Sequence, residues 1–483
     1  MSTTATEAFL KARPGGPVDW STAPPTYKRY PSAGRSVLPW RDAPADLLGS
    51  LLRDLMGLRT AWTYAMTRQG TMPAHQPVVS TGRPVPSGGA LYPVEVYVGV
   101  GATPERAAGL YHYDAAHHSL DLVRSGDHRA ALTGLPGPVP EIVIALTAVF
   151  WRNGFKYRDF AYNLHCQESG ALVAQVLAIA ADRERAARVH LAFDDHAVTG
   201  LLGVDPAAEG VLALLTIGTD ATPLTDPEEP ATPAVQPLDP LPDVSTSLPH
   251  LTRLHAAAAC AVEPAVRRPG ARAATAEISL PAPRPVRLAD GIPGRRSELI
   301  GYRRDPLELD ALADVLRHAA ARCPVDLSAA IDLHVVVDRV KGLAPGAYRY
   351  DVTSHGLTRT AGTTAMAAVR GGPVHANTAL ALATAAAAVI PVGNPLAGGA
   401  GDRWYRILQI GTGLAVHRAA LAAAACGLGS RIHSDGANYT TDAALGLGDR
   451  PERSLSFLLL GHRRPGATVP NPLAHGSHSR ELP

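Results

Sequence analysis

The chain has only four cysteines in 483 residues, Cys166, Cys260, Cys323 and Cys426. They form no CxxC pair and show no metal-like spacing, so neither a disulfide scaffold nor a bound metal is indicated. Cys166 and Cys426 lie inside apolar helical stretches, where a small buried thiol is the ordinary interpretation. We therefore expect reduced thiols, a cytoplasmic location and no metal ion.

The chain also lacks an excess of charge of one sign. Its formal net charge is +2, from 45 Lys and Arg against 43 Asp and Glu. Without a long-range field of one sign, nucleic acid and anionic membrane surfaces are poor candidates as partners. Residues 1–5 show no basic region followed by an apolar core, and the nearest membrane-like run, 378–392, is alanine-rich and too short to span. We expect a globular protein with neither a targeting segment nor a membrane span.

Two further site types lack their motifs. Gly411 and Gly413 form a GxG pair within a helical pattern, whereas a dinucleotide fingerprint needs a turn between strand and helix. His117 and His118 fall in a turn between strands, and His165 has no ligand partner at i+4. The sequence predicts neither a stable nicotinamide site nor a metal site.

The length favours two domains of about 200 residues each. Residues 219–290 are dense in Pro, Asp, Glu, Ser and Thr, a composition that predicts a linker without a core, with one short helix at 251–259. We therefore expect domains at 1–218 and 291–465. The Gly-, Pro-, His- and Ser-rich segment 466–483 is expected to be a flexible tail.

An internal repeat links the two domains. Gly109-Leu110-Tyr111-His112-Tyr113-Asp114 reappears as Gly346-Ala347-Tyr348-Arg349-Tyr350-Asp351, each after an apolar run typical of a strand. Further along the chain, four pairs of landmarks stand 243 positions apart: Tyr162 and Tyr405, Gly170 and Gly413, Gly203 and Gly446, Gly218 and Gly461. A constant offset means that these parts of the two copies align without gaps.

Each copy combines a long apolar helix with a closing strand. The helices are expected at 164–181 and 407–426, with apolar faces at i, i+3 and i+4. The closing strands are expected at 211–215 and 455–460. This pattern predicts an α+β fold formed twice, with a mixed or antiparallel sheet flanked by helices in each domain, and the two domains paired as an intrachain pseudo-dimer.

The first domain, from about residue 27 to 218, resembles the SagB-type dehydrogenases of the nitroreductase superfamily. These are flavin enzymes that oxidise azolines to azoles in ribosomally made peptides. The matching segments are Lys28-Arg29-Tyr30-Pro31, Pro86-Ser87-Gly88-Gly89-Ala90-Leu91-Tyr92-Pro93, Gly109-Leu110-Tyr111-His112-Tyr113-Asp114 and Trp151-Arg152-Asn153-Gly154-Phe155-Lys156-Tyr157-Arg158-Asp159. The second domain resembles the general nitroreductase domain through Arg295-Arg296-Ser297, Gly427-Leu428-Gly429-Ser430 and its closing strand.

The resemblance implies a flavin mononucleotide (FMN) whose dianionic phosphate needs cations and backbone donors. Arg295 and Arg296, expected ahead of a helix, with Ser297, match the segment that holds this phosphate in the superfamily. Arg463 and Arg464, after the last strand, match its second cationic contact. Either pair alone is more simply a solvated surface charge. Both pairs in one domain favour the phosphate site.

The loop Pro86-Ser87-Gly88-Gly89 places two residues without Cβ beside a hydroxyl, so its backbone can lie against a flat ring and donate N–H groups. On pattern alone it is an ordinary glycine turn. In nitroreductases this loop contacts the flavin bound mainly by the partner subunit, so here it would complete the site of the second domain. The second domain has 321–328 in its place, and the first domain has Lys28-Arg29-Tyr30-Pro31 in place of an Arg-x-Ser segment. One complete and one degenerate site, with one FMN per chain, are expected.

Lys156 and Tyr157 match the Lys-Tyr pair of the azoline oxidases, at a position where the second domain has Gly399 and Ala400. A partly desolvated lysine can be neutral near pH 7 and act as a base, and an adjacent tyrosine can relay its proton. Without the resemblance, the pair is a surface lysine beside a half-buried tyrosine.

The superfamily runs the segment 429–436 past the flavin ring. The resemblance thus implies cofactor contacts from Gly429 and Ser430, and a substrate pocket that includes His433 and Asp435. For His433 an ordinary loop histidine is an equally good interpretation.

Together these features predict an FMN-dependent azoline dehydrogenase that oxidises thiazoline or oxazoline rings in a modified peptide, by removal of the Cα proton and hydride transfer to flavin N5. The resemblance implies molecular oxygen as electron acceptor and a cyclodehydratase of the same pathway as partner. Two alternatives stay open: an NAD(P)H-dependent reductase of nitro compounds or quinones, and a catalytically silent scaffold that docks peptide.

Overall fold

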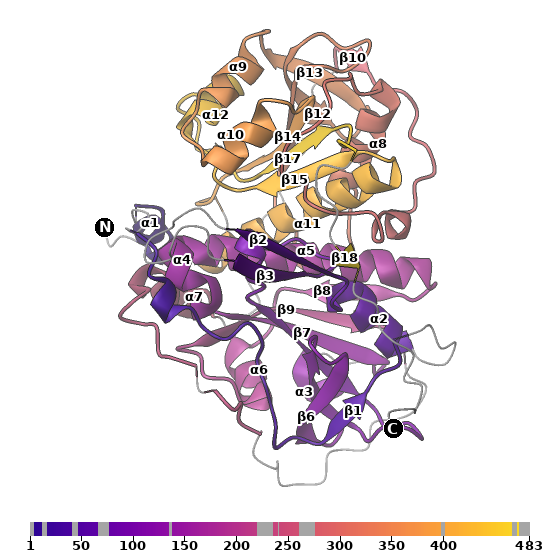
Figure 1. Ribbon diagram of the computed structural model, residues 1–483, viewed down its shortest axis with the longest axis vertical. Coiled ribbons are helices and arrows are strands. Elements are labelled where there is room, and N and C mark those ends of the chain that lie inside the picture. The colour runs from indigo at the N-terminus through magenta and orange to yellow at the C-terminus, as the bar shows by residue number, and fades with distance from the viewer. Residues whose placement is uncertain are drawn as a thin grey trace.

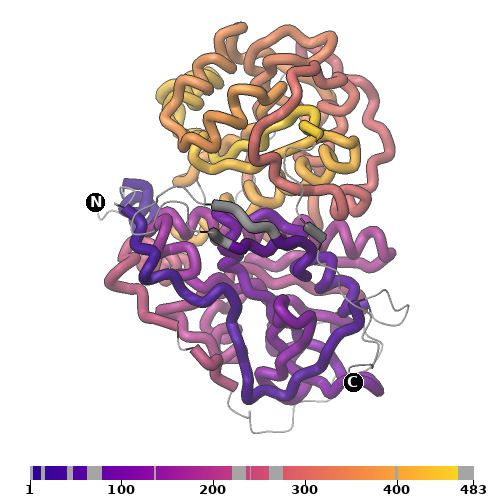
Figure 2. Tube along the Cα trace, in the orientation of Figure 1, coloured from indigo at the N-terminus to yellow at the C-terminus, as the bar shows by residue number. Residues whose placement is uncertain are grey.

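The computed structural model describes residues 4–11, 17–40, 47–65, 77–134, 138–219, 235–239, 241–259, 276–397, 401–465 and 471–472. Two large sheets form the centres of the two halves of the chain, which lie one above the other in Figure 1. In Figure 2 the indigo N-terminal segment runs along the outside of the first half.

The first sheet is antiparallel throughout and has the strand order β1-β6-β5-β4-β7-β9-β8. Its central strands are buried along their whole length, as expected for a sheet covered on both faces. Its strands are β1 (Arg35–Val37), β4 (Val94–Val100), β5 (Gly109–Asp114), β6 (Ser119–Ser125), β7 (Ile142–Val149), β8 (Ala187–His190) and β9 (Glu209–Ile217).

The second sheet repeats this topology in the order β10-β13-β12-β11-β14-β17-β15, with β16 paired to β14. The repeated Gly-to-Asp segments are β5 and β12, in the same place in each sheet. The α+β fold expected from the repeat is confirmed. The strands are β10 (Ile278–Ser279), β11 (Asp332–Val337), β12 (Gly346–Asp351), β13 (Gly356–Ala361), β14 (Ala387–Gly393), β15 (Gly429–His433), β16 (Arg453–Ser454) and β17 (Phe457–Gly461).

Helices cover both sheets. In the first half they are α1 (Ala5–Lys11), α2 (Leu47–Met56), α3 (Arg129–Thr133), α4 (Trp151–Tyr157), α5 (Ala161–Asp182), α6 (Asp195–Leu202) and α7 (Pro249–Ala258). In the second half they are α8 (Leu309–Ala320), α9 (Ala365–Arg370), α10 (Ala376–Leu382), α11 (Arg403–Ala425) and α12 (Tyr439–Ala444). Short 3₁₀ turns are η1 (Trp20–Thr22), η2 (Gly88–Ala90), η3 (Arg158–Phe160) and η4 (Leu288–Gly291).

The two long helices α5 and α11 cross at the centre of the molecule, between the sheets (Figure 1). They touch at Gly170 and Gly413. A Cβ on Gly170 would lie 2.0 Å from the carbonyl oxygen of Ile410, and one on Gly413 would lie 1.9 Å from that of Gln167. Only glycine therefore allows this approach of the two backbones.

Helix α11 is the one helix among the described residues that is long and apolar enough to cross a membrane. Its most apolar 18-residue window is 78% buried inside the protein. Residues Tyr405, Ile407 and Ile410 of α11 belong to the same apolar core as the first sheet. The composition of α11 thus serves the packing between the halves.

The segment 219–290 departs from the expectation of a linker without a core. Its described part includes α7 and β10, and Val244, Leu248, Leu251 and Leu254 are at most 1% exposed within the core of the first half. The reason is the spacing of these four residues, which aligns them on one face. Residues 220–234, 240 and 260–275 lie outside the described residues.

The C-terminal segment returns to the first half. Strand β18 (Asn471–Pro472) pairs with β2 (Thr60–Ala65), which pairs with β3 (Pro77–Gly82) in a small third sheet. This pairing was not expected for a flexible tail. The remaining tail residues, 466–470 and 473–483, lie outside the described residues.

Candidate functional site

The glycine loop follows β3 and has an unusual backbone. Gly89 has a φ of 69°, in the left-handed region, within η2. The loop is closed by a hydrogen bond of 2.8 Å from the Tyr92 N–H to the Ser87 hydroxyl oxygen. Ser87 and the two glycines after it thus form a fixed turn rather than an open one.

Arg295 reaches this loop from the other half of the chain. Its Nε donates a hydrogen bond of 2.7 Å to the carbonyl oxygen of Pro84. Ser297 pairs with Ser430 in a parallel bridge, and the N–H of Glu298 donates to the Ser430 carbonyl at 3.2 Å. Ser297 therefore lies beside the β15 residue Ser430, while the Arg295 N–H still closes a turn with the Gly291 carbonyl at 2.8 Å.

Arg295 and Arg296 precede a helix in the chain, but they do not lie at its N-terminus. The next helix, α8, begins only at Leu309, because the intervening residues pair with β15 and with the strand end at His462. Any ligand at this segment would therefore meet side chains and non-helical backbone, and not a helix N-terminus.

Arg463 lies against the same segment, and Arg464 does not. Arg463 Nη2 donates to the Gly294 carbonyl at 2.6 Å, and its Nε lies 3.4 Å from Oε1 of Glu298. Arg296 Nε lies 3.6 Å from the same oxygen. Arg464 instead donates to the Tyr302 carbonyl at 3.2 Å. Of the four predicted arginines, three gather in one place.

The cluster of Arg295, Arg296 and Arg463 has an excess of positive charge. Burial lowers the pKa of Arg295 to about 10, with a smaller contribution in the same direction from Arg463. Among the described residues, the carboxyl group that pairs with the cluster is Glu298, whose side chain is 4% exposed. Burial raises the pKa of Glu298, against the effect of the two arginines beside it.

A phosphate dianion fits this cluster by charge and by hydrogen bonding. Three guanidinium groups with one carboxyl leave at least two positive charges to be neutralised. The backbone at Gly429 lies close by, since a Cβ there would be 2.8 Å from Cγ of Glu298.

Lys156 and Tyr157 end α4 and converge on the glycine loop. A Cβ on Gly89 would lie 2.8 Å from the Tyr157 hydroxyl oxygen and 3.2 Å from Lys156 Nζ. Lys156 Nζ lies 5.5 Å from the centroid of the Trp20 ring and 5.2 Å from that of Tyr157. Burial lowers the pKa of Lys156, which favours its neutral, basic form.

Tyr157 has the opposite shift. Burial raises the pKa of its phenol, and the negative charges of Glu168 and Asp435 raise it further. The phenol therefore keeps its proton as the lysine loses its own. Gly399 and Ala400, the counterparts of this pair in the repeat, lie outside the described residues.

His433 and Asp435 take part in one hydrogen-bond network. Thr378 Oγ1 lies 2.9 Å from His433 Nδ1 and donates to Asp435 at 2.7 Å, and the His375 N–H donates to Asp435 at 2.8 Å. Burial lowers the pKa of His433 and its Nε2 has no partner. Asp435 is the member of the pair whose charge acts on Tyr157.

The sequence analysis missed Glu168 and Gln167, both on α5. Glu168 Oε1 accepts a hydrogen bond of 2.8 Å from the Gly88 N–H, and Gln167 Oε1 accepts one of 3.0 Å from the Ser434 hydroxyl. A comparison of the two copies of the repeat could have found them, because their counterparts in the second half, Gly411 and Ile410, have no polar side chain.

The position that corresponds, through the repeat, to the site at loop 86–89 is occupied by the protein's own backbone and side chains. The segment that replaces the glycine loop there pairs with β8, through a hydrogen bond of 2.8 Å from the Val189 N–H to the Pro324 carbonyl. The Asp326 carboxylate accepts from the N–H groups of Leu191 and Ala192, at 2.8 and 3.0 Å. These two residues are the counterparts of Ser434 and Asp435.

Buried charges fill the rest of this second place. The Asp195 carboxylate accepts from Arg403 at 2.6 Å and from Arg406 at 2.5 Å, and both arginine side chains are 1% exposed. Lys28, which lies in the segment that the first half has in place of Arg-x-Ser, pairs with Glu209 at the start of β9 at 2.5 Å and is 2% exposed. None of these cations is left to meet a ligand.

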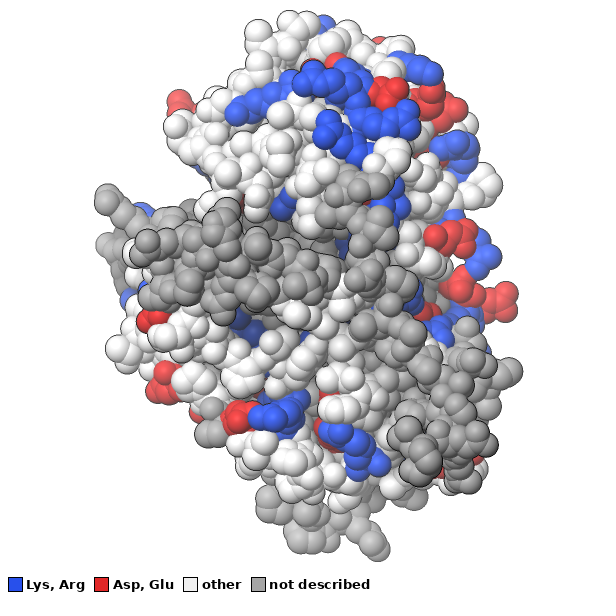
Figure 3. All heavy atoms as spheres, viewed as in Figure 1, with Lys and Arg blue, Asp and Glu red and all other residues white. Residues whose placement is uncertain are grey.

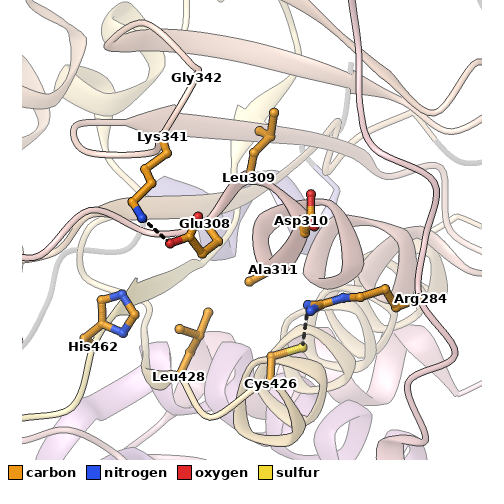
Figure 4. A pocket seen from close by; sticks show the side chains of 10 residues that line it. All are labelled: Arg284, Glu308, Leu309, Asp310, Ala311, Lys341, Gly342, Cys426, Leu428 and His462. Atoms are coloured by element: carbon orange, nitrogen blue, oxygen red, sulfur yellow. Dashed lines mark hydrogen bonds and ion pairs between the residues drawn. The ribbon is translucent and has the colours of Figure 1, made fainter.

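A cavity of about 450 Å³ lies elsewhere in the second half (Figure 4). Leu428 and His462 line it, one residue away from Gly429 and Arg463, but none of the predicted site residues does. Its cations are paired, Lys341 with Glu308 and Arg284 with Asp314.

On the surface of the second half, basic side chains also lie beside acidic ones. In Figure 3, Lys and Arg gather on the second half with Asp and Glu beside them. In that half, Arg303 pairs with Asp305 and Arg339 with Asp338. Among the described residues, no three His, Cys, Asp or Glu side chains are grouped as a metal ion would require.

No family model matches the chain. The microcin B17-processing protein McbC of Escherichia coli is 26% identical over 136 residues, which cover 26% of this chain and 50% of McbC. The chain thus spans about half the length of this curated relative.

Solved structures resemble the chain over different lengths. A protein from Anabaena variabilis described as a nitroreductase has a TM-score of 0.73 at 23% identity, over 96% of this chain and all of that one. The E. coli microcin synthetase McbBCD complex with truncated pro-MccB17 bound has a TM-score of 0.30 at 22% identity, over 39% of this chain and 69% of that chain. The Anabaena structure shows that this chain has the nitroreductase fold.

Proposed function

From the nitroreductase fold of this chain, we propose that it is an FMN-dependent dehydrogenase of the SagB type. Its substrates are thiazoline or oxazoline rings in a ribosomally made, modified peptide, which it oxidises to thiazoles or oxazoles. The observation that carries the proposal is the contact of Arg295 with the loop that begins at Pro84, because it joins the two half-motifs of a flavin site. The partial likeness to a microcin-processing protein supports a peptide substrate.

The cluster of Arg295, Arg296 and Arg463 binds the phosphate in this proposal, with Ser297, Gly429 and Ser430 beside it. Loop 86–89 lies against the flavin from the first half. The hydrogen bond of 2.7 Å between Arg295 and Pro84 holds the arginine cluster next to the start of this loop, so one ligand can contact both. Bound FMN supplies the acceptor of the hydride, and molecular oxygen takes up the electrons afterwards.

Lys156 acts as the base in this proposal. Its neutral amine removes the proton from the ring carbon that was the Cα of an amino acid, while the hydride leaves the neighbouring carbon. The partly buried position lowers the pKa of Lys156, which increases the fraction of the neutral amine that can act as a base. Tyr157, which stays protonated, orients the substrate and returns a proton from the amine towards solvent.

We further propose one FMN per chain, bound between the halves of a pseudo-dimer. The closed second place supports this count, because Asp195, Arg403 and Arg406 fill it with a paired charge cluster. The partner implied by the chemistry is the cyclodehydratase that forms the azoline. A cytoplasmic location agrees with the free state of Cys166, Cys323 and Cys426.

Mass spectrometry of an azoline peptide tests the proposal. Incubation with the FMN-loaded protein and oxygen should remove two hydrogens per ring. Lys156→Ala should abolish this loss and Tyr157→Phe should slow it. The matched control is Lys341→Ala, which changes an exposed lysine at the cavity of Figure 4 and should leave the rate unchanged. Full activity in both site variants would refute the assigned base.

The two alternatives give different results with the same protein. NADPH consumption with a nitroarene, and no change in the azoline peptide, would identify a nicotinamide-fed reductase. A colourless protein that takes up no FMN would identify a docking scaffold.

A further inference from the structure

Glu168 is a buried carboxyl group that touches the glycine loop. It lies on α5 and is 8% exposed. Its Oε1 accepts the Gly88 N–H at 2.8 Å, and the Ser87 hydroxyl also bonds to this carboxyl group. One side chain thus holds two consecutive residues of the loop.

The other side of the loop faces the proposed base. A Cβ on Gly88 would lie 3.3 Å from Glu168 Oε1, while one on Gly89 would lie 2.8 Å from the Tyr157 hydroxyl and 3.2 Å from Lys156 Nζ. The backbone of two glycines therefore separates Glu168 from Lys156 and Tyr157. A shift of this backbone would be felt directly by both catalytic candidates.

The repeat shows that the helix pair does not need this carboxyl group. The counterpart of Glu168 in α11 is Gly411, whose surroundings are the apolar side chains of Ala329 and Ile331. The buried carboxyl group occurs only in the half that carries the glycine loop and the Lys-Tyr pair. Its burial costs stability unless it is compensated, so its presence on this side alone points to a role in the site.

The charge of Glu168 is sensitive to pH. Within the described part of the chain no lysine or arginine forms an ion pair with it, and burial raises its pKa to about 8. The hydrogen bonds from Gly88 and Ser87, and the more distant Arg83, act in the opposite direction. The other titratable groups that face it are Tyr92 and Tyr157, and their charges are coupled to its own.

We propose that Glu168 is a positioning residue of the oxidation, whose carboxylate holds the Ser87–Gly89 backbone in place between the flavin and Lys156. The ionised carboxylate accepts both hydrogen bonds. On protonation it becomes a donor on one oxygen, so Ser87 must turn and the loop loosens. This inference rests on the proposed function for the identity of the base and of the flavin, but the contacts of Glu168 do not depend on it.

The test uses the full chain loaded with FMN and the variants Glu168→Gln and Glu168→Ala. The first readout is the absorption spectrum of bound FMN between about pH 6 and pH 9, which needs no peptide. The native protein should show a spectral change with a midpoint near the pKa of Glu168, and Glu168→Gln should lack it. Glu141→Gln, a change of a surface carboxyl group paired with Arg185, is the control and should keep the native spectral change.

The second readout is the turnover of an azoline peptide. Glu168→Ala should lower kcat by about tenfold or more, because misplacement of a catalytic backbone by about 1 Å has effects of that order. Glu168→Gln should recover part of this loss, since its amide oxygen still accepts the Gly88 N–H, and it should lack the pH dependence.

The outcomes separate the two proposals. Identical spectra and rates in the native protein and both variants would overturn the role of Glu168, and azoline oxidation would still stand. A pH-dependent spectrum that Glu168→Gln abolishes, without any azoline oxidation, would support Glu168 and end the proposed function. If Glu168→Ala does not fold, the nearly isosteric Gln variant decides between these outcomes alone.

Discussion

Arg295 Nε donates a hydrogen bond of 2.7 Å to the carbonyl oxygen of Pro84, across 211 residues of chain. The donor belongs to the second half and the acceptor to the first. Because this contact fixes the arginine cluster beside the glycine loop, the affinity for FMN should depend on residues from both halves at once.

Arg295→Ala and Arg463→Ala should each weaken FMN binding. Removal of a charged hydrogen-bond donor from a buried phosphate site costs about 1.5–3 kcal/mol, or roughly 10- to 100-fold in Kd. A titration of apo-protein followed by quenching of flavin fluorescence measures the effect. Arg450→Ala alters an exposed arginine and should leave the Kd unchanged. An unchanged Kd in both variants would show that the FMN phosphate does not bind at this cluster.

Glu298→Gln should have the opposite effect and tighten FMN binding several-fold. The carboxyl group lies 3.4 Å from Arg463 and 3.6 Å from Arg296, where its negative charge competes with the phosphate. Because burial raises the pKa of Glu298, native affinity should fall as pH rises through that pKa, and the Gln variant should lack this part of the decline. The matched control is Glu308→Gln, which changes an exposed carboxyl group at the cavity of Figure 4 and should leave FMN binding unchanged. If Glu298→Gln binds FMN more weakly than the native protein at every pH, Glu298 does not compete with the phosphate for the arginines.

Asp195→Asn should destabilise the protein by about 3–5 kcal/mol, because it leaves two buried arginines without their carboxylate. Burial alone would raise the pKa of Asp195, but Arg406 and Arg403 outweigh it and hold the pKa below its usual range. The carboxylate therefore stabilises the fold above the ordinary pKa of aspartate. This contribution is lost as pH falls through the lowered native value.

Urea denaturation at pH 7 and at about pH 3 measures the Asp195 effect. The difference between native protein and variant should shrink at the lower pH. Asp449→Asn changes an exposed aspartate and should match the native curve at both. An unchanged midpoint for Asp195→Asn at pH 7 would show that the charge cluster does not stabilise the protein.

The flavin content should be one per chain. Release of FMN by heat, followed by its absorbance against the protein concentration, gives the ratio directly. Asp195→Asn should keep this ratio, since the second place also lacks the arginine cluster and the glycine loop. Two equivalent flavins per chain would contradict the degenerate second site.

Gly170→Ala and Gly413→Ala should each destabilise the protein by about 1–3 kcal/mol, the usual cost of overpacking. The added methyl groups would meet backbone atoms at 2.0 and 1.9 Å, so α5 and α11 must move apart. Gly200→Ala, on α6, meets nothing within 4 Å and should be neutral or slightly stabilising. Equal melting temperatures for all three variants would contradict the close helix contact.

Much of the architecture was predictable because the chain contains it twice. The offset of 243 placed the long helices and the closing strands in both halves. The meeting of loop 86–89 with Arg295 followed from the resemblance to a dimeric fold. The roles of the individual site residues stay predictions, although the structure brings most of them to one place.

The features that were missed depend on tertiary contacts. Glu168 lies among other polar residues of α5, such as Gln167 and Ser169, and only the fold shows that its carboxyl group meets the loop at Gly88. The segment 241–259 was assigned to a linker by composition, although four apolar residues at helical spacing are enough to anchor it in a core. The position of Ser297 depends on its pairing with Ser430 in β15, 133 positions away, which no local pattern reveals.

The covalent link between the halves has a genetic consequence. In a dimer of identical subunits, every substitution enters both sites together, so neither site can be lost without the other. In this chain, Asp195 and Arg403 could close one place while Glu168 and the Lys-Tyr pair remained in the other. The fusion of two copies in one chain would thus have allowed one site to keep its catalytic residues while the other lost its ligand-binding residues and kept only a structural role.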